Sequence, residues 1–444
     1  MSQRTISLHD YARMDTAARA RLLVRSEADL ADFIARVQPI IDQVRTEGDA
    51  ALVHFARAFD KAELSPDRIK ATEEDFEHAF ASLEPEVIES IDYAAHGIRV
   101  FHERQKPEAM WMHEVRPGVF AGEKTEPIPS MALYVPRGKG AFPSVALMTA
   151  IPAVVAGVPE IALITPPRLD GGVDAATLVA ARIAGVEHVY KCGGAQGVAA
   201  VAYGTESVPK CAKIVGPGSP WVVAAKRVLA GVIDPGLPAG PSEAIILADS
   251  TANGAIAALD LIVESEHGPD SSAFLVTDSR SVAEAARAAI PGYWAQMGEQ
   301  RVGFSSAVLC GPRGGIVLTS DIDEAIAFVN AYAPEHLEIV ADEPWTYLGR
   351  IRNAGEVLLG ASTPVPLGNF VLGPNAVLPT SGAARTHSPL SVYDYMKRIS
   401  IGHVTTAAYP ELALHAERLA RYEGFDGHAN AVSETRTRVM ADKA

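Results

Sequence analysis

The amino-acid sequence predicts an α/β protein in which two similar lobes are each built around a parallel sheet. The chain has 444 residues, well beyond the length at which one hydrophobic core stops growing. From Met131 onward, short apolar runs alternate with Ala-rich helical segments, a pattern typical of βαβ units. The same alternation starts again after Gly240-Pro241-Ser242, so we expect a second lobe to follow the first.

The N-terminal part, residues 1–110, is charged, Ala-rich and helically patterned, most clearly over residues 28–46 and 73–102. This pattern predicts an N-terminal helical arm. No arrangement of residues in the arm indicates chemistry.

The two lobes are predicted over residues 111–238 and 239–384. The expected strands are 131–135, 161–165, 188–192 and 213–215 in the first lobe, then 244–248, 273–277 and 315–318 in the second. The expected helices are 145–156, 175–184, 195–203 and 221–229, then 254–267 and 282–289. Residues 359–378 are rich in Pro and Gly. The last part, residues 385–444, looks helical and charged from about Ser388, and we expect it to form a C-terminal arm that reaches across a dimer.

Composition excludes several classes of function. With 39 Lys and Arg against 54 Asp and Glu, the net charge of -15 works against binding to nucleic acid or anionic lipid. The three cysteines have no Cys-x-x-Cys spacing, and Cys192 is expected to be a small buried thiol in a reducing cytosol. No N-terminal apolar stretch suggests export, and residues 145–165 are too interrupted by Pro, Gly and Glu to span a bilayer. We therefore expect a cytoplasmic enzyme without a membrane or nucleic-acid partner.

Glu264 and His267 form the first candidate site. They lie three residues apart at the end of a predicted helix, so their side chains face the same side. Two metal ligands fit that spacing. Taken alone, a solvated Glu and His on a helix surface fit it as well.

Glu335 and His336 form the second candidate site, between a helical run and an apolar strand. An acid beside an imidazole can transfer protons. Neighbouring residues on an extended chain point to opposite faces, so both serve one site only if the backbone turns, which Pro334 favours. A capping Glu and a packed His are the alternative.

Three glycine-bearing turns form the third candidate site. Each follows a predicted strand and precedes a predicted helix, where α/β sheets bind ligands at helix N-termini. The turns are 134–140, 193–197 and 216–219. They indicate a nucleotide cleft, although none is a Gly-x-Gly-x-x-Gly fingerprint or a phosphate loop, and each could be only a tight turn.

These segments together resemble the histidinol dehydrogenase family, from about residue 130 to His428. The most specific matches are 193–196 with Gly204-Thr205-Glu206-Ser207-Val208-Pro209-Lys210, then Leu237-Pro238-Ala239-Gly240-Pro241-Ser242-Glu243, 266–270 and 333–339. The resemblance implies a homodimer with a shared active site, two incomplete Rossmann-like lobes, a zinc ion, and two NAD-dependent oxidations that convert a primary alcohol through an aldehyde to a carboxylate.

The resemblance also implies roles for individual residues. His336 would be the base for hydride removal, and Glu335 would activate water. The implied zinc ligands are Glu264, His267, Asn369 and His428, the last contributed by the partner subunit. NAD would lie near Tyr134, Gln196 and Ser219, and the substrate near Ser144, Ser242 and Glu423. Imidazole, carboxyl and amide groups suit zinc, and the two oxidations require both a base and a water activator.

Several positions depart from the family pattern. The family usually has Gln at Glu264 and Asp at Asn369, so this ligand pair is exchanged. Ser219 replaces an Asn, and Ala376 replaces a His of the histidinol enzymes. Arg137, Lys139 and His387 are also atypical. The two cations lie beside the proposed cleft, either solvated or facing an anionic substrate or cofactor group.

These departures favour a paralogue that oxidises another small polar primary alcohol, for example a hydroxylated sulfonate such as sulfopropanediol. The close alternative is histidinol dehydrogenase itself. A third hypothesis is a non-catalytic relative that binds metal or nucleotide, and the presence of Glu335, His336, His267 and His428 counts against it.

Overall fold

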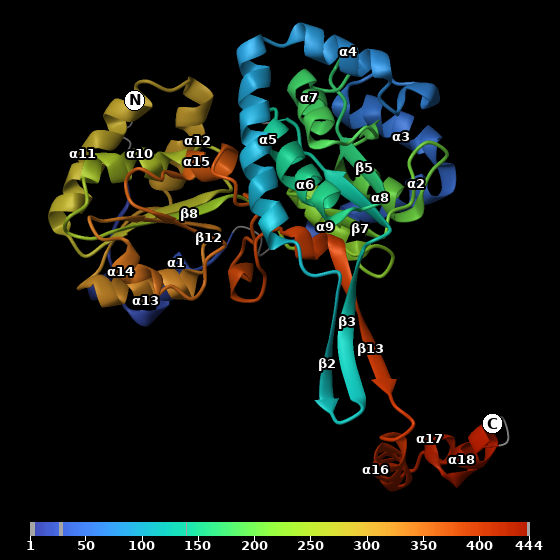
Figure 1. Cartoon of the computed structure of the whole chain (residues 1–444). Coiled ribbons are helices and arrows are strands. Elements are labelled where there is room, and N and C mark those ends of the chain that lie inside the picture. The colour runs from blue at the N-terminus through green and yellow to red at the C-terminus, as the bar shows by residue number, and fades with distance from the viewer. Residues whose placement is uncertain (1–4, 26–29, 139, 442–444) are drawn as a thin grey trace. The chain divides into compact units, whose positions relative to one another are not determined.

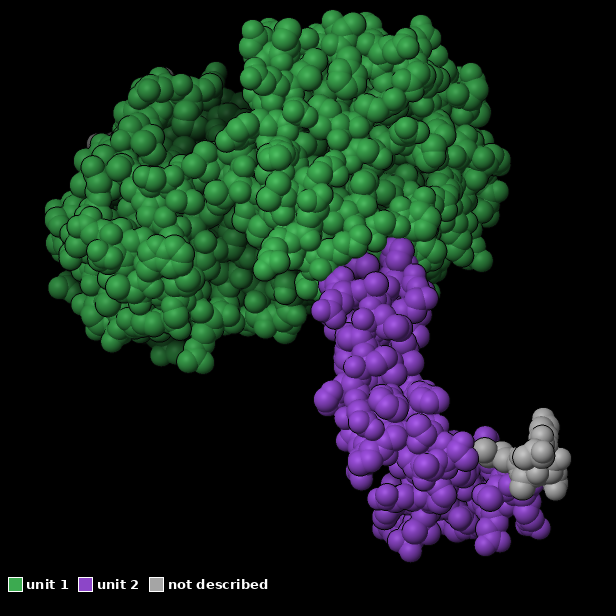
Figure 2. All heavy atoms as spheres, in the orientation of Figure 1, with its two compact units in different colours: residues 1–106, 128–395 green, residues 107–127, 396–444 purple. Residues whose placement is uncertain are grey.

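The computed structural model describes residues 5–25, 30–138 and 140–441. The chain forms two compact units, coloured separately in Figure 2. The first unit comprises residues 1–106 and 128–395, and the second comprises residues 107–127 and 396–444. Residues 128–238 of the first predicted lobe and all of the second predicted lobe belong to the first unit, whereas residues 111–127 belong to the second unit. The expected boundary between the two lobes near residue 238 stays a prediction.

The first sheet lies in the first lobe and has four parallel strands in the order β6-β5-β4-β7. Its strands are β4 (Ser130–Tyr134), β5 (Glu160–Thr165), β6 (Val189–Lys191) and β7 (Lys213–Val215). The helices that follow these strands are α6 (Pro143–Ala156), α7 (Ala175–Ala184), α8 (Gly194–Tyr203) and α9 (Pro220–Val228). The predicted elements of this lobe are confirmed to within two residues at each end.

The second sheet has six parallel strands in the order β1-β10-β9-β8-β11-β12. Its strands are β1 (Leu8–Asp10), β8 (Glu243–Ala248), β9 (Ser272–Thr277), β10 (Gly314–Leu318), β11 (His336–Val340) and β12 (Glu356–Leu359). The four central strands, β8 to β11, are buried along their whole length, because helices cover both faces of the sheet.

Helices cover the second sheet in two layers, as Figure 1 shows. One layer contains α10 (Gly254–Ser265), α11 (Arg280–Trp294), α12 (Glu299–Leu309) and α15 (Val365–Phe370); the other contains α1 (Thr16–Leu22), α13 (Ile322–Tyr332) and α14 (Trp345–Leu348). Successive side chains of β8 point to opposite faces of the sheet and so pack against different helix layers. Ile246 packs in the core with α10 and α11, and Ile245 packs in the core with α1 and α13.

The N-terminal part is largely helical, as predicted, but it belongs to both lobes of the first unit. Its remaining helices are α2 (Ala31–Glu47), α3 (Asp49–Phe55), α4 (Glu73–Ser82) and α5 (Pro85–Gln105), with short turns at Tyr11–Arg13, Ala56–Asp60 and Pro66–Arg68. The first pair packs on α8 and α9, and the second pair packs on α6 and α7. Strand β1 extends the second sheet beside β10. The start predicted for the first long helix, at residue 28, lies outside the described residues.

The second unit contains an antiparallel sheet that the sequence did not predict. Its strands β2 (Met110–Arg116), β3 (Val119–Pro127) and β13 (Met396–Val404) pair in the order β13-β3-β2. Helices α16 (Tyr409–Tyr422), α17 (Asp426–Val432) and α18 (Glu434–Ala441) follow β13. The prediction of a helical segment from Ser388 onward is therefore wrong for residues 396–404. Every residue of β2 is exposed, so no alternation of apolar and polar residues marked it as a strand.

The described part of the chain has no helix that is both long enough and apolar enough to cross a bilayer.

Candidate active site

A pocket of about 650 Å³ lies between the two sheets of the first unit. The first lobe contributes the turns after β4 and β7 and the start of α6. The second lobe contributes the starts of β8 and β11, the end of α10, and α15. The pocket thus meets the carboxyl ends of the first sheet's strands and the amino ends of the second sheet's strands. Eight predicted site residues line it: Ser144, Ser219, Ser242, Glu264, His267, Glu335, His336 and Asn369.

The backbone turn that brings Glu335 and His336 together is centred on Ala333. Helix α13 ends at Tyr332, and Ala333 adopts a left-handed conformation with φ of 53°. Pro334 and Glu335 follow, and His336 is the first residue of β11. His336 Nε2 lies 3.8 Å from Glu335 Oε1. The prediction that these two side chains come together is confirmed. The backbone turns at Ala333, one residue before Pro334, which the sequence had indicated as the turn.

Two further residues hold this pair in place. The backbone N–H of Glu243, at the start of β8, donates to Glu335 Oε2 at 2.9 Å. His336 Nδ1 lies 2.5 Å from Glu356 Oε1, which comes from the register partner of His336 on β12. A carboxylate at Nδ1 accepts the proton there and directs Nε2 toward Glu335 and the pocket.

Burial and neighbouring charge place both groups away from their ordinary titration ranges. Burial raises the pKa of Glu335 to about 8. Burial alone would lower the pKa of His336, but the carboxylates of Glu335, Glu264 and Glu356 raise it to about 10. The pair therefore holds a proton close to the pocket at neutral pH and can pass it between two adjacent side chains.

Glu264, His267 and Asn369 meet at the edge of the pocket. His267 Nδ1 lies 3.1 Å from Glu264 Oε2, and the Asn369 amide donates to Glu264 Oε1 at 2.9 Å. Helix α10 ends at Ser265, two residues earlier than predicted, yet His267 still faces Glu264. Burial acts to raise the pKa of Glu264, but His267 and His336 hold it below its usual value. The Glu264 carboxylate is therefore anionic.

The chemistry of this set fits a zinc ion. Glu264 Oε2 is buried and makes no well-aligned hydrogen bond with any residue that the structure describes, although His267 Nδ1 lies 3.1 Å from it. A carboxylate, an imidazole and an amide whose oxygen can be turned inward are suitable zinc ligands. In the described part of the chain, no three His, Cys, Asp or Glu side chains gather closely enough to bind a metal by themselves. The amide of Asn369 is therefore needed to make a third ligand in this unit.

The three glycine-bearing turns lie where they were predicted, but only two of them reach the pocket. The turns after β4 and β7 line it through Arg137 and Ser219. The third turn lies deeper: the Gly194 N–H donates to the hydroxyl of Tyr134 at 3.1 Å, and Tyr134 and Gln196 are both buried. Ser219 caps α9 without bonding through its side chain, so its hydroxyl is available to a ligand.

Three predicted substrate residues lie in different parts of the chain. Ser144, near the start of α6, and Ser242, before β8, line the pocket, and Ser242 Oγ lies 2.9 Å from His267 Nδ1. Glu423 and the predicted zinc ligand His428 belong to the second unit, at the end of α16 and in α17. Their roles in the site stay predictions.

The atypical residues separate into two groups. Arg137 and Ala376 line the pocket, as does Arg301 on α12, which no motif in the sequence had indicated. Arg301 Nη1 donates to the carbonyl of Glu266 at 3.0 Å. His387 is exposed and bonds to its neighbour Thr386, and Lys139 lies outside the described residues.

Sequence reasoning also missed residues that act at a distance along the chain. Glu356 follows His336 by 20 positions and reaches it only because β12 pairs with β11. The buried Lys226 on α9 donates to the carbonyl of Gly216 at 2.8 Å and so fixes the turn that carries Ser219. A strand-pairing prediction could have indicated the first of these contacts.

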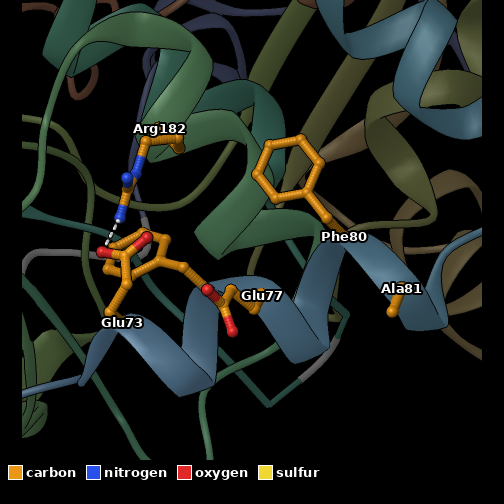
Figure 3. A pocket seen from close by; sticks show the side chains of 6 residues that line it. Glu73, Glu77, Phe80, Ala81 and Arg182 are labelled. Atoms are coloured by element: carbon orange, nitrogen blue, oxygen red, sulfur yellow. Dashed lines mark hydrogen bonds and ion pairs between the residues drawn. The ribbon is translucent and has the colours of Figure 1, made fainter.

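Other candidate features carry no comparable chemistry. Cys192 is buried as predicted, and burial raises the pKa of its thiol well above the usual range. Figure 3 shows a second pocket beside α4 and α7, where Arg182 Nη2 lies 2.7 Å from Glu73 Oε2. The described side chains that line this second pocket include no histidine, cysteine or hydroxyl group: Glu73, Phe76, Glu77, Phe80, Ala81 and Arg182.

Comparison with known proteins agrees with this geometry. The sequence profile of the histidinol dehydrogenase family matches residues 23–436. "Histidinol dehydrogenase homolog 2" of Mesorhizobium japonicum is 63% identical over 436 residues, which cover 98% of this chain and 99% of the relative. Histidinol dehydrogenase of Synechocystis is 45% identical over 410 residues, covering 92% of this chain and 94% of the relative.

A solved structure extends the likeness to the fold. The crystal structure of histidinol dehydrogenase from Elizabethkingia anophelis superposes with a TM-score of 0.92 at 31% identity, covering 99% of both chains. Enzymes of this family are oxidoreductases that act on CH–OH groups. With the profile, the relatives and the fold in agreement, the chain belongs to the histidinol dehydrogenase family.

Proposed function

We propose that the protein is a zinc-dependent, NAD-linked dehydrogenase that oxidises a small polar primary alcohol through the aldehyde to the carboxylate. One observation carries the proposal: the Glu335–His336 pair and the group of Glu264, His267 and Asn369 line the same pocket. The first set can move protons and the second can hold a cation, and oxidation of an alcohol to an acid requires proton removal, an orienting group and an activated water.

The proton chemistry is divided between two side chains. His336 in its neutral form takes the hydroxyl proton at Nε2 while the hydride leaves the alcohol carbon, and Glu356 stabilises the resulting imidazolium through Nδ1. Because the pKa of His336 is raised to about 10, the fraction of the protein in this neutral form increases as pH rises. Glu335, in the ionised form that becomes dominant above its raised pKa of about 8, then accepts a proton from the water that adds to the aldehyde. Its contact with the Glu243 N–H keeps one carboxylate oxygen fixed for this step.

Zinc would be held by Glu264, His267 and Asn369, with the partner subunit's His428 as the fourth ligand. When bound, the ion would orient and polarise the substrate. The same assignment makes the protein a homodimer with a shared active site, in which Glu423 also meets the substrate of the neighbouring subunit. An inactive His336→Ala protein mixed with an inactive His428→Ala protein under exchange conditions is expected to regain partial activity. A stable, fully active monomer would rule the sharing out.

NAD would lie along the first lobe, near Tyr134, Gln196 and Ser219. The pyrophosphate suits the N-terminus of α9, because the helix dipole favours an anion there and the side chain of Ser219 makes no capping bond. Tyr134 is buried against Gly194, so we assign it the support of the turn beneath the cofactor.

The substrate we favour is a polar alcohol other than histidinol, for example a hydroxylated sulfonate. Ala376 stands in the pocket where the histidinol enzymes have a His, and Arg137 and Arg301 add two cations to the lining. The relative at 63% identity is named as a homolog, whereas the relative at 45% carries the enzyme's name outright. L-histidinol is the alternative substrate, and a non-catalytic relative is disfavoured because Glu335, His336 and His267 share the pocket. We place the reaction in the cytoplasm.

The experiment that tests this function is an NADH-release screen of zinc-loaded protein. Histidinol and a panel of uncharged, anionic and cationic primary alcohols are each supplied with NAD, and the acid product is quantified. We expect turnover of a polar alcohol, two NADH for each alcohol consumed, and a loss of activity with a chelator that added zinc restores. Preference for histidinol would select the alternative, and no NAD reduction with any alcohol would overturn the proposal.

A further inference from the structure

Arg25 is connected to the Glu335–His336 pair through Glu243. The sequence of the N-terminal part of the chain indicated no chemistry there. Arg25 Nε lies 2.7 Å from Glu243 Oε1, and the exposed fractions of the two side chains are 11% and 4%. The backbone N–H of the same Glu243 donates to Glu335 Oε2. One buried ion pair therefore separates the N-terminal segment from the proposed water-activating carboxylate.

Arg25 also contacts the turn that presents this carboxylate. Its Nη2 donates to the carbonyl of Tyr332 at 2.5 Å, and its guanidinium lies 3.2 Å from the centre of the Tyr332 ring. Tyr332 is the last residue of α13, and its hydroxyl bonds to Ser272 on β9. A single planar cation thus joins the end of α13 to the start of β8.

The turn between these elements needs such support. Ala333 has a side chain but adopts the left-handed conformation, which persists only where surrounding contacts enforce it. Tyr332 precedes Ala333 directly, and Glu335 follows two residues later. The contacts of Arg25 therefore hold both ends of the strained segment: the Tyr332 carbonyl directly, and Glu335 through Glu243.

We propose that Arg25 is a positioning residue for the reaction, which clamps the turn at 332–335 and so fixes the carboxylate of Glu335 for water activation. The proposal rests on the proposed function for its catalytic consequence. His336 depends less on the clamp, because β11 pairs with both β8 and β12 and Glu356 holds the imidazole separately. Loss of Arg25 should therefore impair aldehyde oxidation more than alcohol oxidation.

The test compares Arg25→Gln with Arg19→Gln. Arg19 is a matched control from the same segment: it lies over the ring of Tyr11 and forms an ion pair with Glu324, so its contacts are of the same kind but lie elsewhere. We expect Arg25→Gln to lower kcat for aldehyde oxidation by about 10- to 100-fold, with a smaller loss for alcohol oxidation and partial recovery in Arg25→Lys. The control should keep the wild-type ratio of the two rates. An equal loss in both steps for Arg25→Gln would overturn the proposal.

A double-variant cycle separates a positioning role from general damage. If Arg25 acts through Glu335, adding Arg25→Gln to Glu335→Gln should change aldehyde oxidation by no more than about twofold. A full additional loss would show that Arg25 acts elsewhere.

Hydrogen–deuterium exchange of the peptide over residues 330–338 tests the clamp without any turnover. Uptake should rise in Arg25→Gln and stay at the wild-type level in Arg19→Gln, and no rise in Arg25→Gln would refute the clamp. If the wild-type protein oxidises no alcohol or aldehyde while exchange still rises as expected, the proposed function fails and the clamp stands.

Discussion

The two lobes of the first unit present opposite edges of similar parallel sheets to one pocket. The first sheet contributes the carboxyl ends of its strands and the N-terminus of α9 at Ser219. The second sheet contributes the amino ends of β8 and β11 and the C-terminal end of α10, with Glu264 and His267. A helix N-terminus favours an anion and a helix C-terminus favours a cation. We therefore infer that one fold supplies an anion-binding wall and a cation-binding wall by turning opposite ends of its two sheets toward the pocket.

The largest expected effect concerns the base on the cation-binding wall. His336→Ala should lower kcat for NAD reduction by about 10²- to 10⁴-fold, because it removes the group that takes the hydroxyl proton. Zinc content should stay at the wild-type level, since His336 is not a proposed ligand. The measurement is steady-state NADH formation together with metal analysis of the same sample. Wild-type turnover in this variant would show that the base lies elsewhere.

A step-specific effect is expected for the neighbouring acid. Glu335→Gln keeps the shape of the side chain but removes its ability to accept a proton from water. Oxidation of the aldehyde should therefore fall by about 10²-fold or more, while oxidation of the alcohol falls less. Single-turnover measurements started separately from alcohol and aldehyde distinguish the two steps. Equal losses in both would contradict the division of labour between Glu335 and His336.

The exchanged zinc ligands give a smaller, non-additive effect. Glu264→Gln leaves the proposed shell without a carboxylate and should weaken zinc binding by about 10- to 100-fold. Adding Asn369→Asp restores one negative charge on the other side of the ion and should recover much of the affinity. Zinc titrations of the single and double variants provide the comparison. If the double variant binds no better than Glu264→Gln, Asn369 is not a ligand and zinc uses three protein ligands plus water.

The smallest expected effect is on stability and concerns Glu338, a buried acid on β11. Burial, with Asp260 beside it, raises the pKa of Glu338 to about 9, so the folded state keeps a proton that the unfolded chain loses near its ordinary pKa of 4.5. Stability from this group is complete below pH 4.5 and is lost as pH rises toward 9. Glu338→Gln mimics the protonated form and should raise the free energy of unfolding at pH 9 by about 1 kcal/mol or more. Lys226 on the first lobe is the opposite case, because burial lowers its pKa to about 8, so its cost to stability is complete below pH 8 and shrinks as pH rises toward its ordinary pKa of 10.5. Lys226→Met should therefore gain more stability at pH 6 than at pH 9. Thermal unfolding from pH 6 to 9 measures both; no gain at pH 9 in Glu338→Gln would contradict a protonated Glu338.

Local patterns in the sequence predicted much of the first unit. Strand β7 has the predicted limits of 213–215, since its apolar run is short and bounded by turns. Glu264 and His267 meet because their spacing along a helix end decides which side they face. The exposed β2 and the strand β13 could not be predicted from periodicity, because neither buries one regular face.

The parts of the site that the sequence did not predict depend on contacts between distant segments. Glu356 reaches His336 through strand pairing, and Arg25 reaches Glu243 across 218 positions of sequence. Nothing local in either residue specifies its partner. The edge used by the second sheet was also unexpected, because ligands in parallel α/β sheets usually bind at the carboxyl ends of the strands.

The most direct test of the two-wall account is anomalous X-ray diffraction from crystals grown with zinc and NAD. We predict a zinc peak bounded by Glu264, His267 and Asn369, completed by the partner subunit's His428, with the dinucleotide along the turn that carries Ser219. A zinc peak at another site, or NAD bound along the starts of β8 and β11, would contradict the account.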